Sequence, residues 1–175
     1  MYEYPVILTP LDNGDVMAGF PDVPEALIYG ENAAFALEWA QDALHVALAG
    51  YMDDHRDIPG PSASAPGQPT VGPSPMAALK LALYQAMRDQ GISQLRLAGL
   101  LHCDARQVRR LLDLDHQSTV NQLMDAAEVL GFRLGFDLRT KDGDVYQPAA
   151  SIMPEQVPCA TARIRTVGID GKLSA

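Results

Sequence analysis

Four arginines gather in one short stretch of the second half of the chain, and their spacing suits contact with nucleic acid. Residues 93–112 read SQLRLAGLLHCDARQVRRLL, with four arginines and one aspartate. Apolar residues recur at helical spacing on both sides of the three-residue turn His102-Cys103-Asp104, which predicts two short helices packed on each other. Their inner faces are expected to carry Leu97, Ala98 and Leu101 in the first helix and Val108, Leu111 and Leu112 in the second.

This pattern turns the polar residues of the second helix outward. Arginine reaches a guanine edge with two hydrogen bonds or neutralises a phosphate, and glutamine pairs with adenine. The start of the first helix, Ser93-Gln94, offers backbone amides and short polar groups of the kind that hold phosphate. An isolated arginine more often only solvates a helix face, but here charge, turn and inner pattern coincide. The stretch predicts a helix-turn-helix whose DNA contacts are Ser93, Gln94, Arg106, Gln107, Arg109 and Arg110.

Net charge divides the chain in two. The 175 residues carry a net charge of −9, which by itself argues against binding phosphate. Residues 1–60, however, hold eleven acidic residues and one basic residue, Arg56, whereas residues 61–175 hold eleven acidic and twelve basic residues. The acidity therefore belongs to the first part, and the second part is free to bind nucleic acid.

Residues 1–60 have the pattern of a small α+β domain. Strands are expected over residues 2–9, 15–20 and 26–29, with the first two joined by an Asn13-Gly14 hairpin turn and the last two separated by residues 21–24. Asn32 then caps a helix that runs to about Tyr51. The fold class is thus a small antiparallel sheet with one covering helix, followed by an all-α helix-turn-helix domain.

The remaining chain divides by composition. Residues 61–75 are rich in Pro, Gly and Ser and are expected to form a linker, in which residues 69–72 could return as an edge strand. Residues 76–139 form the expected helix-turn-helix domain, with helices over 76–90, 93–101 and 105–114 and a fourth, capped by Ser118 or Thr119, that ends at Gly131. Residues 133–139 alternate like a strand that pairs with its copy in a dimer. Residues 140–175 form a tail without an assigned role.

Five segments of the sequence together resemble a known protein family. They read YPVIL, GFPDVPEALIYG, IPGPS, MAALKLALYQAMRDQGIS and VRRLLDLDHQSTVNQLMDAAEVLGFRL. The last is the most specific, because LLDLDH followed by a helix and LGFRL is unusual among helix-turn-helix proteins. Over about residues 2–138 the chain resembles HicB-type antitoxins, the partners of HicA-type RNA-cleaving toxins, in the subgroup with a C-terminal helix-turn-helix.

The resemblance implies a first domain similar to a partial ribonuclease H fold that lacks catalysis and masks a toxin's active site. A toxin that grips RNA is basic, so an acidic domain competes well for the same surface. The expected partners are a small basic HicA-like toxin, operator DNA and further copies of the chain in a dimer or tetramer. The expected activity is neutralisation of the toxin and repression of the chain's own operon. Candidates for the toxin-binding surface are Asp12, Asp15, Asp22, Glu25 and Glu31.

Two other classes of function were weighed. A divalent-metal nuclease needs converging carboxylates, but Asp12 and Asp15 flank a turn, Asp22 lies between prolines, and the four histidines lack metal spacing. We therefore expect no catalysis, no metal and no cofactor. A stand-alone transcriptional regulator, whose first domain binds a ligand or dimerises, stays open. Neither a secretory signal nor a membrane-spanning run is found, so a cytoplasmic protein is expected. Its two cysteines lack the spacing of a disulfide pair and are expected to be ordinary thiols.

Overall fold

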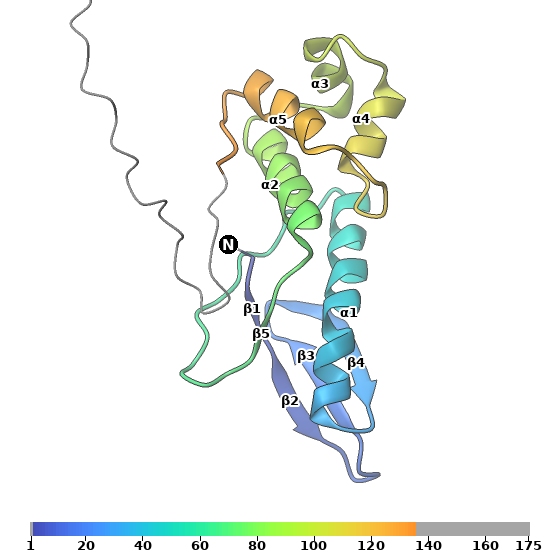
Figure 1. Ribbon diagram of the computed structural model, residues 1–175, viewed down its shortest axis with the longest axis vertical. Helices are drawn as coiled ribbons and strands as arrows, with labels where there is room; N and C mark the ends of the chain where they lie inside the picture. Colours follow the sequence, from blue (N-terminus) through green and yellow to red (C-terminus); the bar gives the residue numbers. More distant parts are fainter. Residues whose placement is uncertain (1, 136–175) are drawn as a thin grey trace, which may run out of the picture. The chain divides into compact units, whose positions relative to one another are not determined.

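The computed structural model of the chain describes residues 2–135 (Figure 1). Five strands, a long helix and four shorter helices make up most of this range, which confirms the predicted α+β class. Residues up to Leu134 form one compact unit. The elements in chain order are β1 (Tyr4–Pro5), β2 (Ile7–Pro10), β3 (Val16–Phe20), β4 (Val23–Gly30), α1 (Ala33–Asp53), β5 (Thr70–Val71), α2 (Pro75–Asp89), α3 (Gln94–Leu100), α4 (Ala105–Leu112) and α5 (Val120–Val129).

Strands β2, β3 and β4 form an antiparallel sheet in that order. The predicted Asn13-Gly14 turn joins β2 to β3, and Gly14 adopts a φ of 90°, which glycine reaches at no steric cost. The predicted start of the third strand is wrong, because β4 begins at Val23. Phe20 pairs with Val23 across a turn of only two residues, whereas the preceding Gly19 pairs with Leu27. The residues of β4 between Val23 and Leu27 therefore have no partner on β3 and form an irregularity of the bulge type.

Helix α1 covers one face of this sheet, as expected (Figure 1). Asn32 caps it by accepting a hydrogen bond of 2.9 Å from the backbone N–H of Phe35, which confirms the predicted start. The residues that meet the sheet are spaced by four, and the first two of them are small: Ala36, Ala40, Leu44 and Leu48, all fully buried. Small side chains at the start of the helix let it approach the sheet closely.

The Pro/Gly/Ser segment runs back along the first strands. Its strand β5 pairs antiparallel with β1, so the edge strand that the sequence allowed is present. The hydroxyl of Tyr4 donates to the carbonyl of Pro59 at 2.7 Å, and Gln41 of α1 donates to the carbonyl of Gly72 at 2.8 Å. The backbone of Ser62 donates to the Asp22 carboxylate at 2.9 Å. These bonds fasten the segment to the first domain, while the domain boundaries stay a prediction.

Helices α2 to α5 follow the predicted order. Ser74, Ser93, Asp104 and Thr119 cap their first turns, and Thr119 forms a capping box with Gln122. Helix α4 ends at Leu112 instead of the predicted Leu114, because the backbone of Asp113 is extended. The inner faces of α3 and α4 are as predicted, with Leu97, Ala98, Val108, Leu111 and Leu112 buried and Leu101 half-buried.

The turn between α3 and α4 contains a residue in the left-handed region. His102 has a φ of 51°, a conformation that costs most L-residues about 1–2 kcal/mol relative to the right-handed one. The backbone N–H of the next residue, Cys103, donates to the carbonyl of Ala98 at 3.0 Å and closes the end of α3. The geometry of this turn sets how α4 is presented.

The predicted strand over residues 133–139 is not seen where it can be checked. Residues 133–135 form no strand, and residues 136–139 lie outside the described residues. The tail from residue 140 on, with Cys159, also lies outside them. Among the helices of the described part, none is both long enough and apolar enough to cross a bilayer.

Replacement of His102 tests this turn. His102→Gly should leave the free energy of unfolding at least unchanged, because glycine removes the left-handed strain at an entropic cost of about 0.5–1 kcal/mol. His102→Val should destabilise the protein by more than about 1 kcal/mol, because a β-branched residue avoids positive φ. Urea unfolding of the two variants measures the difference. Equal stability would show that residue 102 does not adopt this conformation.

Candidate nucleic-acid interface and acidic surface

Helix α4 presents its polar residues to solvent over a fully apolar inner face. Val108 is completely buried and Leu111 and Leu112 nearly so. Arg106, Arg109, Arg110 and Gln107 are all exposed, as their positions around the helix require. The side chains that the sequence assigns to DNA are therefore held on a rigid helix and are free to reach a partner.

The start of each helix in this pair is fixed by a polar cap. The carboxylate of Asp104 accepts the backbone N–H of Gln107 at 2.8 Å, and the hydroxyl oxygen of Ser93 accepts that of Arg96 at 3.2 Å. Each cap satisfies a backbone amide that the helix itself leaves free. The capping role leaves the hydroxyl hydrogen of Ser93 available as a donor.

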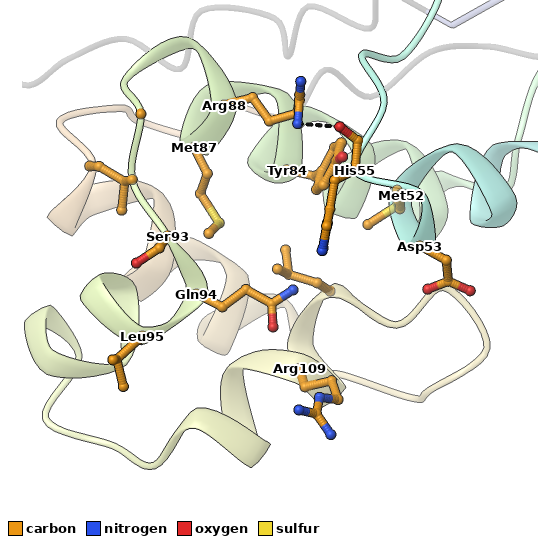
Figure 2. A pocket seen from close by; sticks show the side chains of 13 residues that line it. Met52, Asp53, His55, Tyr84, Met87, Arg88, Ser93, Gln94, Leu95 and Arg109 are labelled. Carbon is orange, nitrogen blue, oxygen red and sulfur yellow. Dashed lines mark hydrogen bonds between the residues drawn. The ribbon is translucent and has the colours of Figure 1, made fainter.

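Three of the six predicted DNA contacts meet in one groove (Figure 2). Ser93, Gln94 and Arg109 line a depression of about 760 Å³, which also includes Asp53 and His55 from the end of α1. Arg106 and Arg110 are not among its lining residues. Gln107 lines a separate, smaller depression of about 170 Å³ together with Gln122 of α5. The predicted contacts thus spread across the exposed width of α4.

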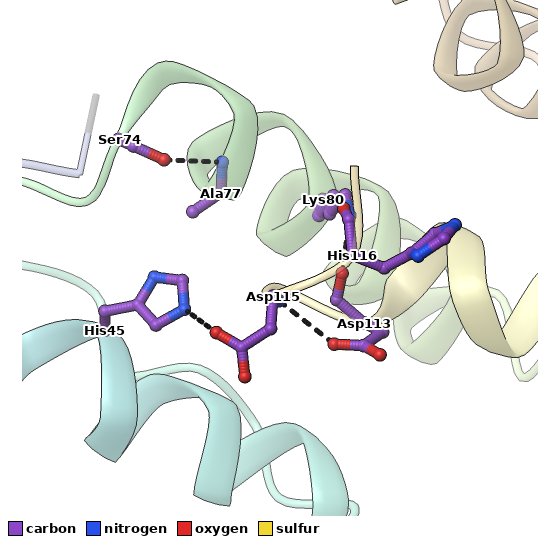
Figure 3. A network of polar contacts seen from close by, with 7 residues as sticks. All are labelled: His45, Ser74, Ala77, Lys80, Asp113, Asp115 and His116. Atoms are coloured by element: carbon purple, nitrogen blue, oxygen red, sulfur yellow. Dashed lines mark hydrogen bonds and ion pairs between the residues drawn. The ribbon is translucent and has the colours of Figure 1, made fainter. Parts of the chain in front are cut away.

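A buried lysine holds the chain that leaves α4 (Figure 3). Lys80 of α2 is fully buried, and its ammonium donates to the backbone carbonyls of Asp113 and His116. Burial lowers the pKa of Lys80, although the carboxylates of Asp113 and Asp115 act in the opposite direction. The two hydrogen bonds fix the loop directly after α4, and hence the end of that helix.

The same loop is also tied to the first domain. The Nε2 atom of His45, on α1, lies 2.9 Å from a carboxylate oxygen of Asp115 (Figure 3). Asp115 is largely exposed, so solvent screens this pair and its contribution to stability is small. The pair mainly fixes position, because it links the helix that covers the sheet to the loop that follows α4.

Among the acidic candidates, Glu25 is engaged within the protein. The hydroxyl of Tyr51 donates to its carboxylate at 2.8 Å, and Arg56 donates at 2.9 Å. The guanidinium of Arg56 also lies 3.7 Å from the centre of the Tyr51 ring. The bond from Tyr51, followed by a backbone hydrogen bond and by the bond from Arg56, lowers the pKa of Glu25 below its ordinary value. This carboxylate joins β4 to the end of α1.

The other acidic candidates divide into engaged and free side chains. Asp22 accepts two hydrogen bonds from Ser62, and Asp15 is bonded to Asn13 within the hairpin turn. Asp12 and Glu31 are exposed, and no hydrogen bond joins them to another described residue. A count of acidic residues in the sequence does not separate these two cases. Their role in binding a toxin stays a prediction.

Sequence reasoning missed a second apolar face on α1. Phe35, Trp39 and Val46 are 41%, 44% and 71% exposed, although all three are large and apolar. They are spaced by four and seven residues, so they share one side of the helix. A helical-wheel comparison with the covering line of Ala36, Ala40, Leu44 and Leu48 would have revealed this stripe before the structure was known.

The described residues contain no group of three or more His, Cys, Asp or Glu side chains arranged to hold a metal ion. Cys103 is a free, half-buried thiol. Within residues 2–135 the structure combines one cationic helix face with an acidic first part of the chain.

Comparison with known proteins places the chain among antitoxins. Residues 3–82 match the family described as HicB_like antitoxin of bacterial toxin-antitoxin system. The chain is 34% identical over 131 residues to Antitoxin HicB 1 of Photorhabdus laumondii, covering 75% of this chain and 83% of that protein. It is 36% identical over 131 residues to Antitoxin HicB of Escherichia coli K12, covering 75% of this chain and 95% of that protein. It is 32% identical over 135 residues to Antitoxin HicB of Pseudomonas fluorescens, covering 77% and 92%.

The engagement of Glu25 predicts a pH-dependent contribution to stability. Because its pKa is lower in the folded protein than its ordinary value of 4.5, its stabilising effect is present above that pH and is lost as the pH falls through the lowered pKa. The melting temperature of Glu25→Gln should be below that of the original protein at pH 7, and the gap should close in acid. Asp12→Asn, at a carboxylate without such bonds, should show no such gap. A gap that is constant with pH would contradict the assignment.

Loss of the buried ammonium should weaken the fold. Lys80→Met keeps the apolar part of the side chain but removes the ammonium that donates to two backbone carbonyls. Because the loop that carries these carbonyls is largely exposed, water can replace part of the lost hydrogen bonding. We expect the free energy of unfolding to fall by about 1–3 kcal/mol. Arg88→Met on the same helix removes a surface pair with Asp57 and an exposed hydrogen bond to the carbonyl of His55, and should cost about 1 kcal/mol or less. Chemical denaturation measures both, and equal losses would refute the special role of Lys80.

Proposed function

Since the chain belongs to the HicB-like antitoxins of bacterial toxin–antitoxin systems, we propose that it neutralises an RNA-cleaving toxin with its first domain and represses its own operon through α3 and α4. The family membership fits a regulatory role without catalysis. The observation that best supports the DNA-binding half is the exposed arginine face of α4, in a chain that is acidic as a whole.

The helix pair has the features that DNA recognition needs. The second helix of a helix-turn-helix enters the major groove with its first residues, while the start of the preceding helix meets the backbone. Arg106 and Gln107 lie in the first turn of α4, and Arg110 follows one turn later. Ser93 and Gln94 open α3 and share a groove with Arg109. We therefore propose base contacts for Arg106, Gln107 and Arg110, and phosphate contacts for Ser93, Gln94 and Arg109.

The acidic first domain fits a basic partner. Residues 1–60 contain eleven carboxylates and a single arginine. That arginine, Arg56, is already paired with Glu25. A protein that grips RNA presents a positive surface to phosphates, and opposite fields speed the encounter of two such proteins. The partner in this proposal is a small basic toxin of the HicA type.

Self-association completes the proposed repressor. A single helix pair covers few base pairs, so proteins of this kind read palindromic sites as dimers or higher oligomers. We expect a dimer or tetramer assembled through the second half of the chain. The expected location in the cell is the cytoplasm, where both the operon and the toxin's RNA targets lie.

A co-expression experiment tests the toxin-binding half. The full chain is produced together with the small basic protein encoded beside it, and capture of that protein and recovery of cell growth are scored. Both are expected. Growth arrest that persists despite equal production of the two proteins would overturn the antitoxin function of this chain.

Arginine substitutions test the DNA-binding half. Replacement of Arg106, Arg109 and Arg110 together by Ala should abolish binding to the operon's own promoter and leave capture of the basic partner intact. Singly, Arg106→Ala and Arg110→Ala should each cost about 1–3 kcal/mol of specific binding, whereas Arg109→Ala should mainly reduce the salt dependence. Glu128→Gln removes an exposed charge on α5, outside the predicted DNA contacts, and is the control. Promoter binding by the triple variant, measured by fluorescence anisotropy, would show that α4 is not the recognition helix.

A further inference from the structure

The exposed apolar stripe of α1 borders a groove. Phe35 and Trp39 stack at an angle, with their ring centres 6.1 Å apart, and Val46 continues the stripe two turns later. Between this side of α1 and strand β4 lies a depression of about 440 Å³. Its apolar lining consists of Leu27, Ile28, Trp39, Ala43, Val46 and Ala47. A large, partly exposed tryptophan beside such a depression is the type of residue that dominates protein–protein interfaces.

Strand β4 offers a backbone edge beside this groove. In the described sheet β4 pairs with β3 on one side only, and it is eight residues long. The backbone groups on the other side of such a strand are a template for an added strand. Leu27 of β4, 46% exposed, lies at the boundary between this edge and the groove. An extended segment of a partner would therefore find both backbone partners and an apolar pocket.

The charges around the groove select the partner. Asp42 lines it, and Glu38, one helical turn earlier on α1, is exposed. Glu25 also lines it, but its carboxylate is already bonded to Tyr51 and Arg56. No lysine or arginine precedes Arg56 in the sequence. A second copy of this chain would bring the same carboxylates against their own kind, which costs free energy. A basic segment with an apolar anchor complements both the pocket and its rim.

We propose that the groove between α1 and β4, with Trp39 at its centre, is the docking site for an extended basic segment of the toxin. This inference rests on the proposed function and names the surface that performs it. It replaces the hairpin carboxylates with Trp39, Val46 and Asp42 as the residues on which capture depends. The segment lies along β4, its apolar side chain enters the groove, and its basic side chains meet the acidic rim.

The open face of the sheet is the rival surface, and its paired strand residues carry no charge. Ile7 and Tyr29 are 50% and 56% exposed there, on the side that α1 does not cover. The residues that share this side in the strand pairing are Ile7, Thr9, Met17, Gly19, Leu27 and Tyr29, all uncharged. An apolar surface without carboxylates has no preference for a basic partner. Charge therefore distinguishes the two surfaces.

The test compares variants of the full chain for binding to the small basic protein encoded beside it, prepared in an inactive form. Trp39→Ser should raise the dissociation constant about 30-fold or more, as loss of a central aromatic anchor does. Asp42→Lys should slow association and flatten its dependence on salt. Ile7→Ser, at a similarly exposed apolar position on the open face, should change the constant by less than about threefold. Unchanged melting temperatures show that the variants are folded.

Each outcome decides one point. Loss of binding in Trp39→Ser but not in Ile7→Ser supports the groove. If Trp39→Ser does not fold, Val46→Arg tests the same groove at a position that is 71% exposed. Normal binding by Trp39→Ser or loss confined to Ile7→Ser overturns the groove but keeps the antitoxin function. A shift from dimer to monomer in Trp39→Ser without the partner would identify a second copy as the occupant. Failure of the unaltered chain to bind would overturn the proposed function itself.

Discussion

The close packing of α1 on the sheet is the contact on which the rest of the described structure depends. A Cβ atom on Gly30 would lie 2.9 Å from the backbone nitrogen of Ala36, so only glycine permits the chain to turn this tightly from β4 into the helix. Once α1 is seated, Tyr51 reaches Glu25 and His45 reaches Asp115. The 21 residues of α1 thus connect the sheet, the end of β4 and the loop after α4. The orientation of both proposed binding surfaces follows from this one helix.

The helices and their starts could be predicted from sequence because their signals are local. Asn32, Ser93 and Thr119 cap helices through bonds to residues three positions ahead, and the buried faces repeat every three to four residues. The arginine face of α4 was predictable for the same reason. Once the apolar residues of a short helix are assigned to the buried side, its arginines must lie on the exposed side. The strand bound that failed depends on pairing instead: Val23 enters β4 only because Phe20 lies opposite it.

The polar contacts that tie distant segments together could not be predicted from composition. Lys80 looks like an ordinary exposed lysine on an amphipathic helix, yet it is fully buried because two carbonyls of a later loop face it. Glu25 and Asp22 count as acidic surface in the sequence, but Tyr51 and Ser62 engage them. Net charge gives the sign of a domain's field, whereas the surface that a partner touches depends on which carboxylates remain free of such bonds.

An acidic segment and a cationic helix face can occur in one short chain because electrostatic forces are screened over a short range. At physiological salt the screening length is about 8 Å, so an exposed arginine is governed by its nearest neighbours and much less by the net charge of the protein. Residues 93–112 have four arginines against one aspartate. That aspartate, Asp104, is held at the start of α4, where its charge is stabilised by the helix dipole. The local field around α4 is therefore positive in a protein whose net charge is −9, as the proposed contact with DNA requires.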